Sequence, residues 1–423
     1  MLHVVQAALA GVSAARVIDR ACALPAMVDR WREAPIHLVA VGKAAPAMAT
    51  ALLERSEVHV RAALAIGTHP SPQMPASLDF LAAGHPYPDE RSRAAARAAL
   101  EVAAAVPPDG HLVLLISGGA SALMAEAADG LAFEVKLAAT RAFMLAGADI
   151  YQLNALRKHL SRVKGGRLAA ACPGATTTLA LSDVVGDDLS VIGSGPGMPD
   201  PSTWLDVARG VDACAAWDAL PSHVRVRVEQ GCRGAVAETP KPGDPRLARA
   251  GGVVVGSASH AVDAARLAAE QLGYAVMVLP DRVTGAAREA ALTWLGRALA
   301  FARSRGDACC VLSSGETTVR VQGNGVGGRN LEFALALVEP MHGMANVMAA
   351  SIGTDGVDGT SDAAGAVVDG STLARAAARG LPPVAEMLDR NDSFNFFQPL
   401  GDAVRTGRTD TNVGDLQVLL IHP

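Results

Sequence analysis

Three glycine-rich segments in the C-terminal half combine residue types that bind phosphate and metal ions. They read Ser-Ser-Gly-Glu-Thr-Thr over 313–318, Gly-Asn-Gly-Val-Gly-Gly-Arg-Asn over 323–330 and Gly-Thr-Asp-Gly-Val-Asp-Gly over 353–359. Glycine lets backbone N–H groups approach a ligand, an arginine before a helical run supplies a fixed positive charge, and carboxylates can hold a metal ion. We therefore predict a site for a phosphorylated, metal-bound ligand. The residues expected to form it are Gly315, Glu316, Gly325, Gly327, Gly328, Arg329, Asn330 and Asp355.

A second candidate lies near the N-terminus, where an apolar run over 36–41 ends in Gly42-Lys43 and turns into a helical pattern. In an open α/β sheet, ligands bind outside the carboxyl ends of the strands, where helix N-termini also point. Lys43 is thus well placed to meet an anion, although a solvated lysine is the plain alternative. The segment is not a Walker P-loop, because His37 and Ala44 stand where that motif needs Gly and Ser or Thr.

The third candidate is a small-residue loop that follows the apolar run over 112–116. Consecutive N–H groups and two hydroxyls in such a loop form a nest for phosphate or carboxylate. A plain strand-to-helix turn needs only one glycine, so the sequence favours an anion site over a turn. The predicted substrate contacts are Ser117, Gly118, Gly119, Ala120 and Ser121.

Carboxylates follow the apolar run over 177–181. Asp183 is nearest to this strand end, and Asp187 and Asp188 come shortly after it. Carboxylates in this position can hold hydrated magnesium or accept a hydroxyl proton, and helix capping explains Asp188 equally well. We expect Asp183 to be catalytic or a metal ligand, with Asp187 as the second metal ligand.

A basic stretch runs from Asn154 to Arg167 and contains Arg157, Lys158, His159 and Lys164. Basic runs are most often solvated helix faces. We interpret this one in that way.

The segment Gly323–Gly328 also matches the Gly-x-Gly-x-x-Gly dinucleotide fingerprint, after a possible strand over 318–322. The fingerprint needs an acidic residue about 20 positions further on, and Asp355 arrives somewhat late for that place. An arginine at the start of the following helix suits a transferring phosphoryl group better than a dinucleotide. Phosphoryl transfer therefore ranks above hydride transfer, which stays open.

The helices and strands that the sequence predicts around these residues are typical of an α/β protein. Short apolar runs alternate with alanine-rich helical stretches, which predicts a largely parallel sheet with helices on both faces. The length of 423 residues suggests two lobes, and the Gly- and Pro-rich segment Glu229–Gly252 predicts domains over 1–240 and 241–423. The predicted strands are 36–41, 63–66, 112–116, 177–181, 253–255, 275–279, 308–312, 347–352 and 416–421.

Composition excludes several classes of function. A net charge of -5 and a pI near 6.1 offer no basic surface for nucleic acid. The six cysteines show no zinc spacing and read as reduced thiols. No stretch of about 18 apolar residues predicts a membrane span, so we expect a cytoplasmic protein with small-molecule partners. A homodimer is compatible with the sequence.

Taken together, the motifs resemble the class II glycerate 2-kinases, whose C-terminal region is called the MOFRL domain. The resemblance covers nearly the whole chain in one order. It rests on the segments 41–45, 84–90, 115–123, 154–161, 182–184, 193–196, 327–332 and 353–359.

The resemblance implies ATP-dependent phosphorylation of D-glycerate at its 2-hydroxyl, with Mg²⁺ required. It also implies a Rossmann-like N-terminal lobe and a smaller MOFRL lobe over about 308–418, with the active site in the cleft. The residues matching Lys43 and Arg329 are regarded as essential in the family, and the glycine-rich segments become the nucleotide-binding set. We expect Lys43 and Arg329 to clamp the γ-phosphoryl group. The alternatives are a nicotinamide-dependent hydroxypyruvate reductase and a non-catalytic binder of sugar phosphates.

Overall fold

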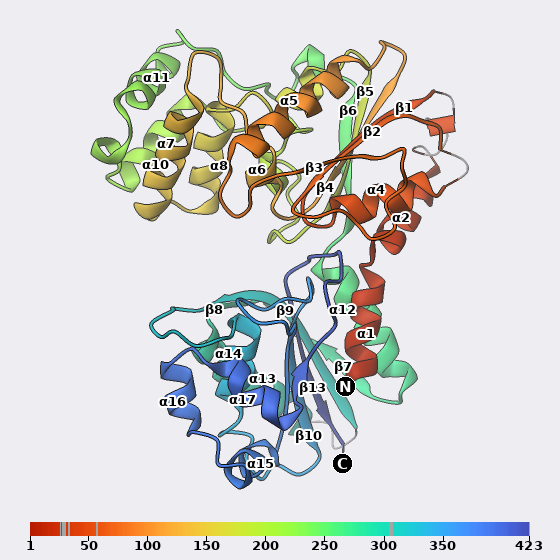
Figure 1. The fold of residues 1–423 in the computed structure, drawn as a ribbon, viewed down its shortest axis with the longest axis vertical. Helices are drawn as coiled ribbons and strands as arrows, with labels where there is room; N and C mark the ends of the chain where they lie inside the picture. The colour runs from red at the N-terminus through yellow and green to blue at the C-terminus, as the bar shows by residue number, and fades with distance from the viewer. Residues whose placement is uncertain (26, 28–30, 33, 56–57, 304–307, 423) are drawn as a thin grey trace. The chain divides into compact units, whose positions relative to one another are not determined.

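The computed structural model describes the chain except for residues 26, 28–30, 33, 56–57, 304–307 and 423. The chain folds into two compact units, and each unit contains its own β-sheet (Figure 1). The middle unit is Val17–Val255, and the terminal unit combines Met1–Arg16 with Gly256–Pro423. The predicted boundary at residue 240 lies inside the middle unit, because the chain still adds an edge strand to the first sheet before it leaves.

The middle unit is built on a sheet with the strand order β3-β2-β1-β4-β5-β6. The pairs among β1 to β5 are parallel. Strands β1 and β4 are buried along their whole length, as expected for parallel strands covered on both faces. The strands are β1 Ile36–Val41, β2 Val60–Gly67, β3 Asp79–Ala82, β4 His111–Ile116, β5 Ala175–Leu181 and β6 Ala250–Gly256.

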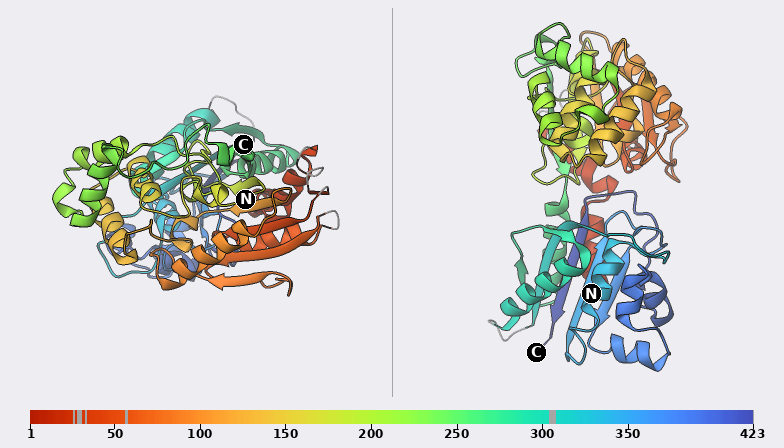
Figure 2. Two further views of the ribbon diagram at one scale, coloured as in Figure 1. Left: turned by 90° about the horizontal axis from the view of Figure 1, so that it is seen from above. Right: turned by 90° about the vertical axis from the view of Figure 1, so that its left-hand side faces the viewer.

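Helices of the middle unit fall into two groups. One group packs on the sheet, and its longest member, α5, begins at a capping box formed by Asp89 and Ser92. The other group packs around its own apolar core, which includes Phe143 and Trp204, and stands beside the sheet (Figure 2). The first group is α2 Ala14–Cys22, α4 Ala45–Leu53, α5 Glu90–Ala104, α6 Ala120–Leu123 and α9 Arg167–Ala170; the second is α7 Phe133–Leu145, α8 Ile150–His159, α10 Trp204–Ala213 and α11 Ser222–Cys232.

The terminal unit has a mixed sheet with the order β12-β11-β10-β13-β9-β7, and β8 also pairs with β9. Only β7 and β8 run parallel to their neighbour β9, while the remaining pairs are antiparallel. The prediction of a largely parallel sheet is therefore confirmed in the middle unit and wrong here. The strands are β7 Ala275–Val278, β8 Val283–Ala286, β9 Cys309–Thr318, β10 Val347–Gly353, β11 Gly365–Asp369, β12 Ala403–Val404 and β13 Asp415–Ile421.

Helices cover both faces of this second sheet. On one face α12 packs on the strands and α1 packs on α12, so closely that a Cβ at Gly11 would lie 2.5 Å from Ala264 Cβ. On the other face α13 and α14 enclose the main apolar core. The helices are α1 Leu2–Gly11, α12 Ala258–Gln271, α13 Ala287–Arg303, α14 Arg329–Leu337, α15 Thr372–Ala378, α16 Val384–Asp389 and α17 Ser393–Phe397.

Each predicted strand overlaps an observed one, whereas the short strands β3, β8, β11 and β12 were not predicted. The prediction of a possible strand over 318–322 is wrong. β9 ends at Thr318, and the N–H groups of Gln322 and Gly323 donate to the Asn391 side chain instead of a sheet partner.

Among the described residues, no helix by itself has the length and apolar character to cross a membrane. The bent pair α1 and α2 passes this test when both helices are counted together.

Candidate active site

Lys43 and the loop 117–121 lie side by side at the carboxyl ends of the central strands β1 and β4, and we call this end of the middle sheet its carboxyl edge. β1 and β4 are neighbours in register, with Val41 opposite Ile116, so both strands end at the same level. Lys43 N–H donates to Gly118 O at 2.9 Å, and Ala44 N–H donates to Ser117 Oγ at 3.0 Å. The adjoining Gly42 has φ 135°, and a Cβ there would lie 2.1 Å from Ser117 Oγ. Only glycine permits this approach.

His85 adds a side chain to this edge that the motif analysis gave no role. A Cβ on Gly119 would lie 3.0 Å from His85 Cδ2, 3.1 Å from its Nε2 and 3.5 Å from Lys43 Cγ. Burial and the charge of Lys43 lower the pKa of His85 below its ordinary value. The edge therefore carries an amine and a neutral imidazole close to a loop of small residues. The sequence signal for His85 is its place in Gly84-His85-Pro86, one of the segments that carry the family resemblance.

A buried polar chain fixes the far end of the loop. Ser121 Oγ lies 2.8 Å from Ser194 Oγ, and Ser194 Oγ donates to Asn154 Oδ1 at 3.0 Å. Lys164 Nζ donates to the carbonyls of Ser121 at 2.8 Å and Met124 at 3.0 Å. The loop thus has a fixed backbone, which a preorganised binding site requires.

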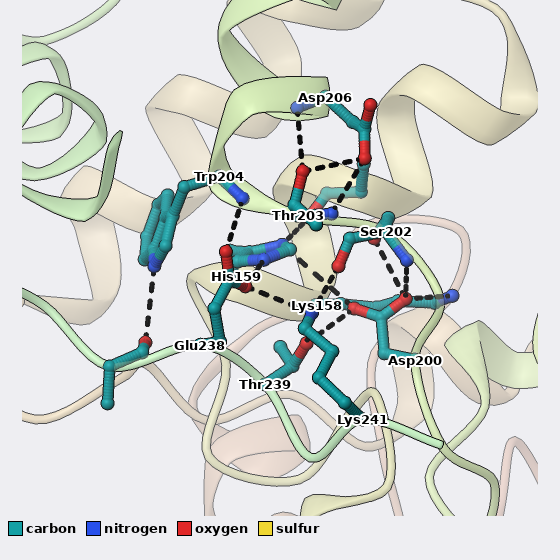
Figure 3. Close-up of polar contacts among 12 residues, drawn as sticks. Lys158, His159, Asp200, Ser202, Thr203, Trp204, Asp206, Glu238, Thr239 and Lys241 are labelled. Atoms are coloured by element: carbon teal, nitrogen blue, oxygen red, sulfur yellow. Dashed lines mark hydrogen bonds and ion pairs between the residues drawn. The ribbon is translucent and has the colours of Figure 1, made fainter. Parts of the chain in front are cut away.

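The prediction that the basic stretch is a solvated helix face is wrong. Lys158, His159 and Lys164 are almost completely buried. Lys158 forms an ion pair with Asp200 at 3.0 Å, and His159 Nε2 lies 2.8 Å from Glu238 Oε2 (Figure 3). The basic residues looked solvated because the carboxylates that pair with them in the interior, Asp200 and Glu238, are distant in sequence.

Asp183 and Asp187 follow β5, at the carboxyl end where the sequence places them. Asp187 N–H donates to Val184 O, and Asp187 has φ 53° in the tight turn that results. Asp188 Oδ1 accepts the N–H of Ser190 at 2.8 Å in a turn, and no helix begins at Asp188, so this carboxylate stabilises a turn and is not a helix cap. Within the described ranges, no three His, Cys, Asp or Glu side chains lie together as a metal site. A metal at Asp183 and Asp187 would need further ligands from a substrate and water.

In the terminal unit, Arg329 begins α14 and is held by two carboxylates. Its Nε and Nη2 donate to Asp415 at 2.8 and 2.9 Å, and its Nη1 donates to Glu316 Oε1 at 2.9 Å. Burial lowers the pKa of Arg329, but the Asp415 charge and hydrogen bonds outweigh burial and raise it overall. Asp415 is 1% exposed and opens β13 opposite Gly315, which explains how it reaches the arginine. The sequence gives no signal for Asp415 beyond a carboxylate before a strand.

Asn330 and Asp358 complete this network. The N–H groups of Asn330 and Leu331 donate to the Asp358 carboxylate at 3.1 and 2.7 Å, and Asn330 Nδ2 donates to Asp415 Oδ1 at 2.9 Å. The first turn of α14 is therefore satisfied by a carboxylate of the protein itself. Burial raises the pKa of Asp358 to about 7.

The glycine-rich loop before α14 packs against the protein. Cβ atoms would lie 2.4 Å from Asp392 Cβ at Gly325, 2.3 Å from Ser393 Oγ at Gly327 and 2.5 Å from the Asp358 carbonyl carbon at Gly328. The Gly325 N–H donates to Arg390 O at 2.9 Å. A cavity of about 370 Å³ adjoins the loop, lined by Asn324, Gly325, Val326, Arg390, Asp392 and Asn395. Close packing of backbone explains these glycines without a dinucleotide.

Asp358 gives the terminal unit a pH-dependent stability that can be tested. Its folded pKa of about 7 lies above the ordinary value of 3.8. The contribution of this group is therefore fully present below pH 3.8 and is lost as pH rises through about 7. Asp358→Asn is neutral throughout and should reduce the fall in stability between about pH 5 and pH 8. Urea unfolding followed by the fluorescence of buried Trp294 measures this, and an equal or steeper fall in the variant would contradict it.

Comparison with known proteins gives matches along most of the chain. A model described as a domain of unknown function, DUF4147, matches residues 1–229, and the MOFRL family model matches residues 309–415. A protein of Agrobacterium vitis, provisionally named a hydroxypyruvate reductase, is 38% identical to this chain. The alignment covers 96% of this chain and 93% of the relative. The D-glycerate 2-kinase of Thermotoga maritima is 36% identical, with 91% of this chain and 90% of the relative covered.

The fold is also that of a solved relative. The crystal structure of a glycerate kinase from Thermotoga maritima matches with a TM-score of 0.85 at 33% identity, over 99% of this chain and 97% of the other. Similarity in sequence and in structure thus extends through both units. The chain belongs to the class II glycerate kinase family, whose C-terminal region is the MOFRL domain.

Proposed function

We propose that this protein transfers the γ-phosphoryl group of ATP to the 2-hydroxyl of D-glycerate and releases 2-phosphoglycerate and ADP. The relatives named as glycerate kinases support the reaction class. The observation that carries the proposal is the arginine fork at Arg329, which is fixed by the buried carboxylate of Asp415 and the exposed carboxylate of Glu316. Such a fork suits a group that changes charge distribution during transfer.

The Arg329 guanidinium keeps donors for a ligand. Arginine has five N–H donors, and the bonds to Asp415 and Glu316 employ one on each of its three nitrogens. Two N–H groups remain, one on each terminal nitrogen. In the proposed reaction they donate to phosphoryl oxygens, and the nucleotide contacts Gly315, Glu316, Gly325, Gly327, Gly328, Asn330 and Asp355.

The edge formed by Lys43 and the loop 117–121 is proposed to bind anionic oxygens of the substrates. Lys43 supplies charge, the loop supplies backbone N–H groups, and the neutral imidazole of His85 adds a further hydrogen-bonding group. D-Glycerate offers a carboxylate for the loop. Asp183 would then orient the 2-hydroxyl or accept its proton.

Magnesium is proposed to bind with the nucleotide. Mg²⁺ in phosphoryl-transfer sites usually takes one or two protein carboxylates, and substrate phosphates and water complete its coordination. Asp183 and Asp187 at the end of β5 fit that donor set, and they would hold an ion that neutralises phosphate charge.

Asp183→Asn is expected to raise the magnesium concentration needed for half-maximal turnover, or to abolish turnover, because one anionic ligand is lost. A magnesium titration at saturating ATP measures the change. Asp188→Asn, which alters a carboxylate that accepts the Ser190 N–H in a turn, is the matched control. Identical titration curves for Asp183→Asn and the unaltered protein would assign Asp183 a structural role.

Hydroxypyruvate reduction is the competing function, because two relatives from Agrobacterium vitis carry that provisional name. The loop Gly323–Gly328 argues against it, since in the described residues no strand leads directly into this loop, as the dinucleotide fingerprint requires.

One experiment separates these functions. The protein is incubated with D-glycerate, ATP and magnesium, and the product is tested directly with enolase, which consumes 2-phosphoglycerate but not 3-phosphoglycerate. A parallel reaction with hydroxypyruvate and NADH or NADPH is followed by absorbance. We expect ADP and 2-phosphoglycerate in the first reaction and no oxidation of cofactor in the second. Oxidation of cofactor without ADP release would overturn the proposal.

A further inference from the structure

Behind the loop 117–121 lies a buried group of cations that the proposed mechanism does not use. It consists of Lys136 on α7, Arg157 on α8 and Lys164 in the segment between α8 and α9. Lys136 is 3% exposed and Lys164 is 1% exposed. Burying even one charge without an opposite charge is costly, so three cations in one place call for an explanation.

The carboxylate nearest to this group is already engaged. Glu126 Oε2 accepts from Arg97 at 2.7 Å, and Glu126 Oε1 lies 3.4 Å from Arg93. Lys136 Nζ donates to the Glu126 carbonyl, and Lys164 Nζ donates to the carbonyls of Ser121 and Met124. The two lysines are thus bonded to neutral carbonyl oxygens and not to a carboxylate, and burial lowers the pKa of both, that of Lys136 to about 7.

Arg157 is the member of this group that can reach a ligand. It lies three residues after Asn154 on α8, so both occupy one side of the helix, and the Asn154 side chain reaches Ser194 and through it Ser121. Arg157 is partly exposed, and in the described part of the chain its guanidinium makes no hydrogen bond or ion pair. The pKa of Arg157 is lowered by burial, and the pKa of Lys164 is lowered by burial and then by Lys136 and Arg157, which agrees with their proximity.

We propose that Arg157 binds the carboxylate of the acceptor substrate, with the buried side chains of Lys136 and Lys164 behind it and the loop 117–121 beside it. The inference deepens the proposed function, on which it rests, by assigning the residue that selects a hydroxy acid over a neutral polyol. A guanidinium matches the two oxygens of a carboxylate with two parallel N–H bonds. A substrate carboxylate bound here would add a negative charge next to this basic group, where Lys136 and Lys164 themselves bond only to carbonyl oxygens.

The test compares binding and turnover in three variants. Arg157→Ala removes the fork, Arg157→Lys keeps the charge without it, and Arg209→Ala alters an exposed arginine of the same unit as the control. Hydrogen bonds to charged groups contribute about 1.5–3 kcal/mol, so the Kd and KM for D-glycerate should rise about 10- to 150-fold in Arg157→Ala. The Kd and KM of Arg157→Lys should lie between those of the unaltered protein and of Arg157→Ala, because lysine keeps a point charge. The KM for ATP should not change.

Calorimetric titration with D-glycerate and with glycerol separates this inference from the proposed reaction. The preference for D-glycerate should fall in Arg157→Ala by the same factor as its affinity. If the protein binds D-glycerate through Arg157 but transfers no phosphoryl group, the reaction fails and the assignment of Arg157 stands. An unchanged D-glycerate Kd in both Arg157 variants, or a rise confined to the KM for ATP, overturns the assignment. Arg157→Lys keeps the test usable if Arg157→Ala does not fold.

Discussion

Arg329→Lys is expected to lower kcat about 10³-fold while leaving the fold intact, because arginines that stabilise a transferring phosphoryl group contribute at least that factor. Lysine keeps the charge but has no planar fork. It can pair with Asp415 or face a ligand, whereas Arg329 uses Nε and Nη2 for Asp415 and still presents donors. The ADP release rate at saturating D-glycerate and ATP measures the effect.

Arg297→Lys is the matched control, since Arg297 is an exposed arginine of the same unit paired with Asp281. Its turnover should equal that of the unaltered protein. A double-mutant cycle with Lys43→Met then asks whether both cations act on one group, because the losses multiply only if they are independent. Turnover of Arg329→Lys near that of the unaltered protein would remove Arg329 from the mechanism.

Lys158→Met is expected to destabilise the middle unit by about 3–5 kcal/mol, the usual effect of removing one partner from a buried ion pair. Asp200 is fully buried, and without Lys158 its oxygens keep hydrogen bonds from Ser202 and Thr239 and a 4.0 Å contact with His159 Nδ1 among the described residues (Figure 3). The charge of Asp200 would then be buried without an opposite charge in contact.

Urea unfolding measures this effect through Trp204, whose ring lies 4.6 Å from that of His159 in the same cluster. Arg162→Met is the control, because its pair with Asp129 is largely exposed and should contribute at most about 1 kcal/mol. Equal midpoints for the two variants would show that the Lys158–Asp200 pair contributes no more than a surface pair.

The strands of the middle unit could be predicted because they are buried on both faces and appear as unbroken apolar runs. β1 coincides with the predicted 36–41, and β4 begins one residue before the predicted run at His111. The short strands β3, β8, β11 and β12 have at most five residues, which is too few for an apolar run that stands out from the flanking segments. The antiparallel pairing of most strands in the terminal sheet was not predicted, because an apolar run does not indicate the direction in which a strand runs.

For the candidate site, sequence reasoning succeeded where adjacent strands bring two segments together. Lys43 and the loop 117–121 meet because β1 pairs with β4. It failed for carboxylates that come from far along the chain. Asp415 is 86 residues from Arg329, and nothing near either residue announces their pairing.

The glycines before α14 show a second limit of sequence reasoning. A glycine needed for close backbone packing and a glycine needed for a ligand have the same sequence signature. At Gly325 and Gly328 a side chain would collide with Asp392 or Asp358, so these positions require glycine whether or not a nucleotide binds.

The division of the chain has a consequence for biosynthesis. Val17–Val255 is continuous, so it can fold while later residues are still being translated. Helix α1 precedes this unit in the chain, whereas its partner α12 follows it, and the second sheet is complete only when β13 has been made. The contact between α1 and α12 can therefore form only after the whole middle unit has been synthesised.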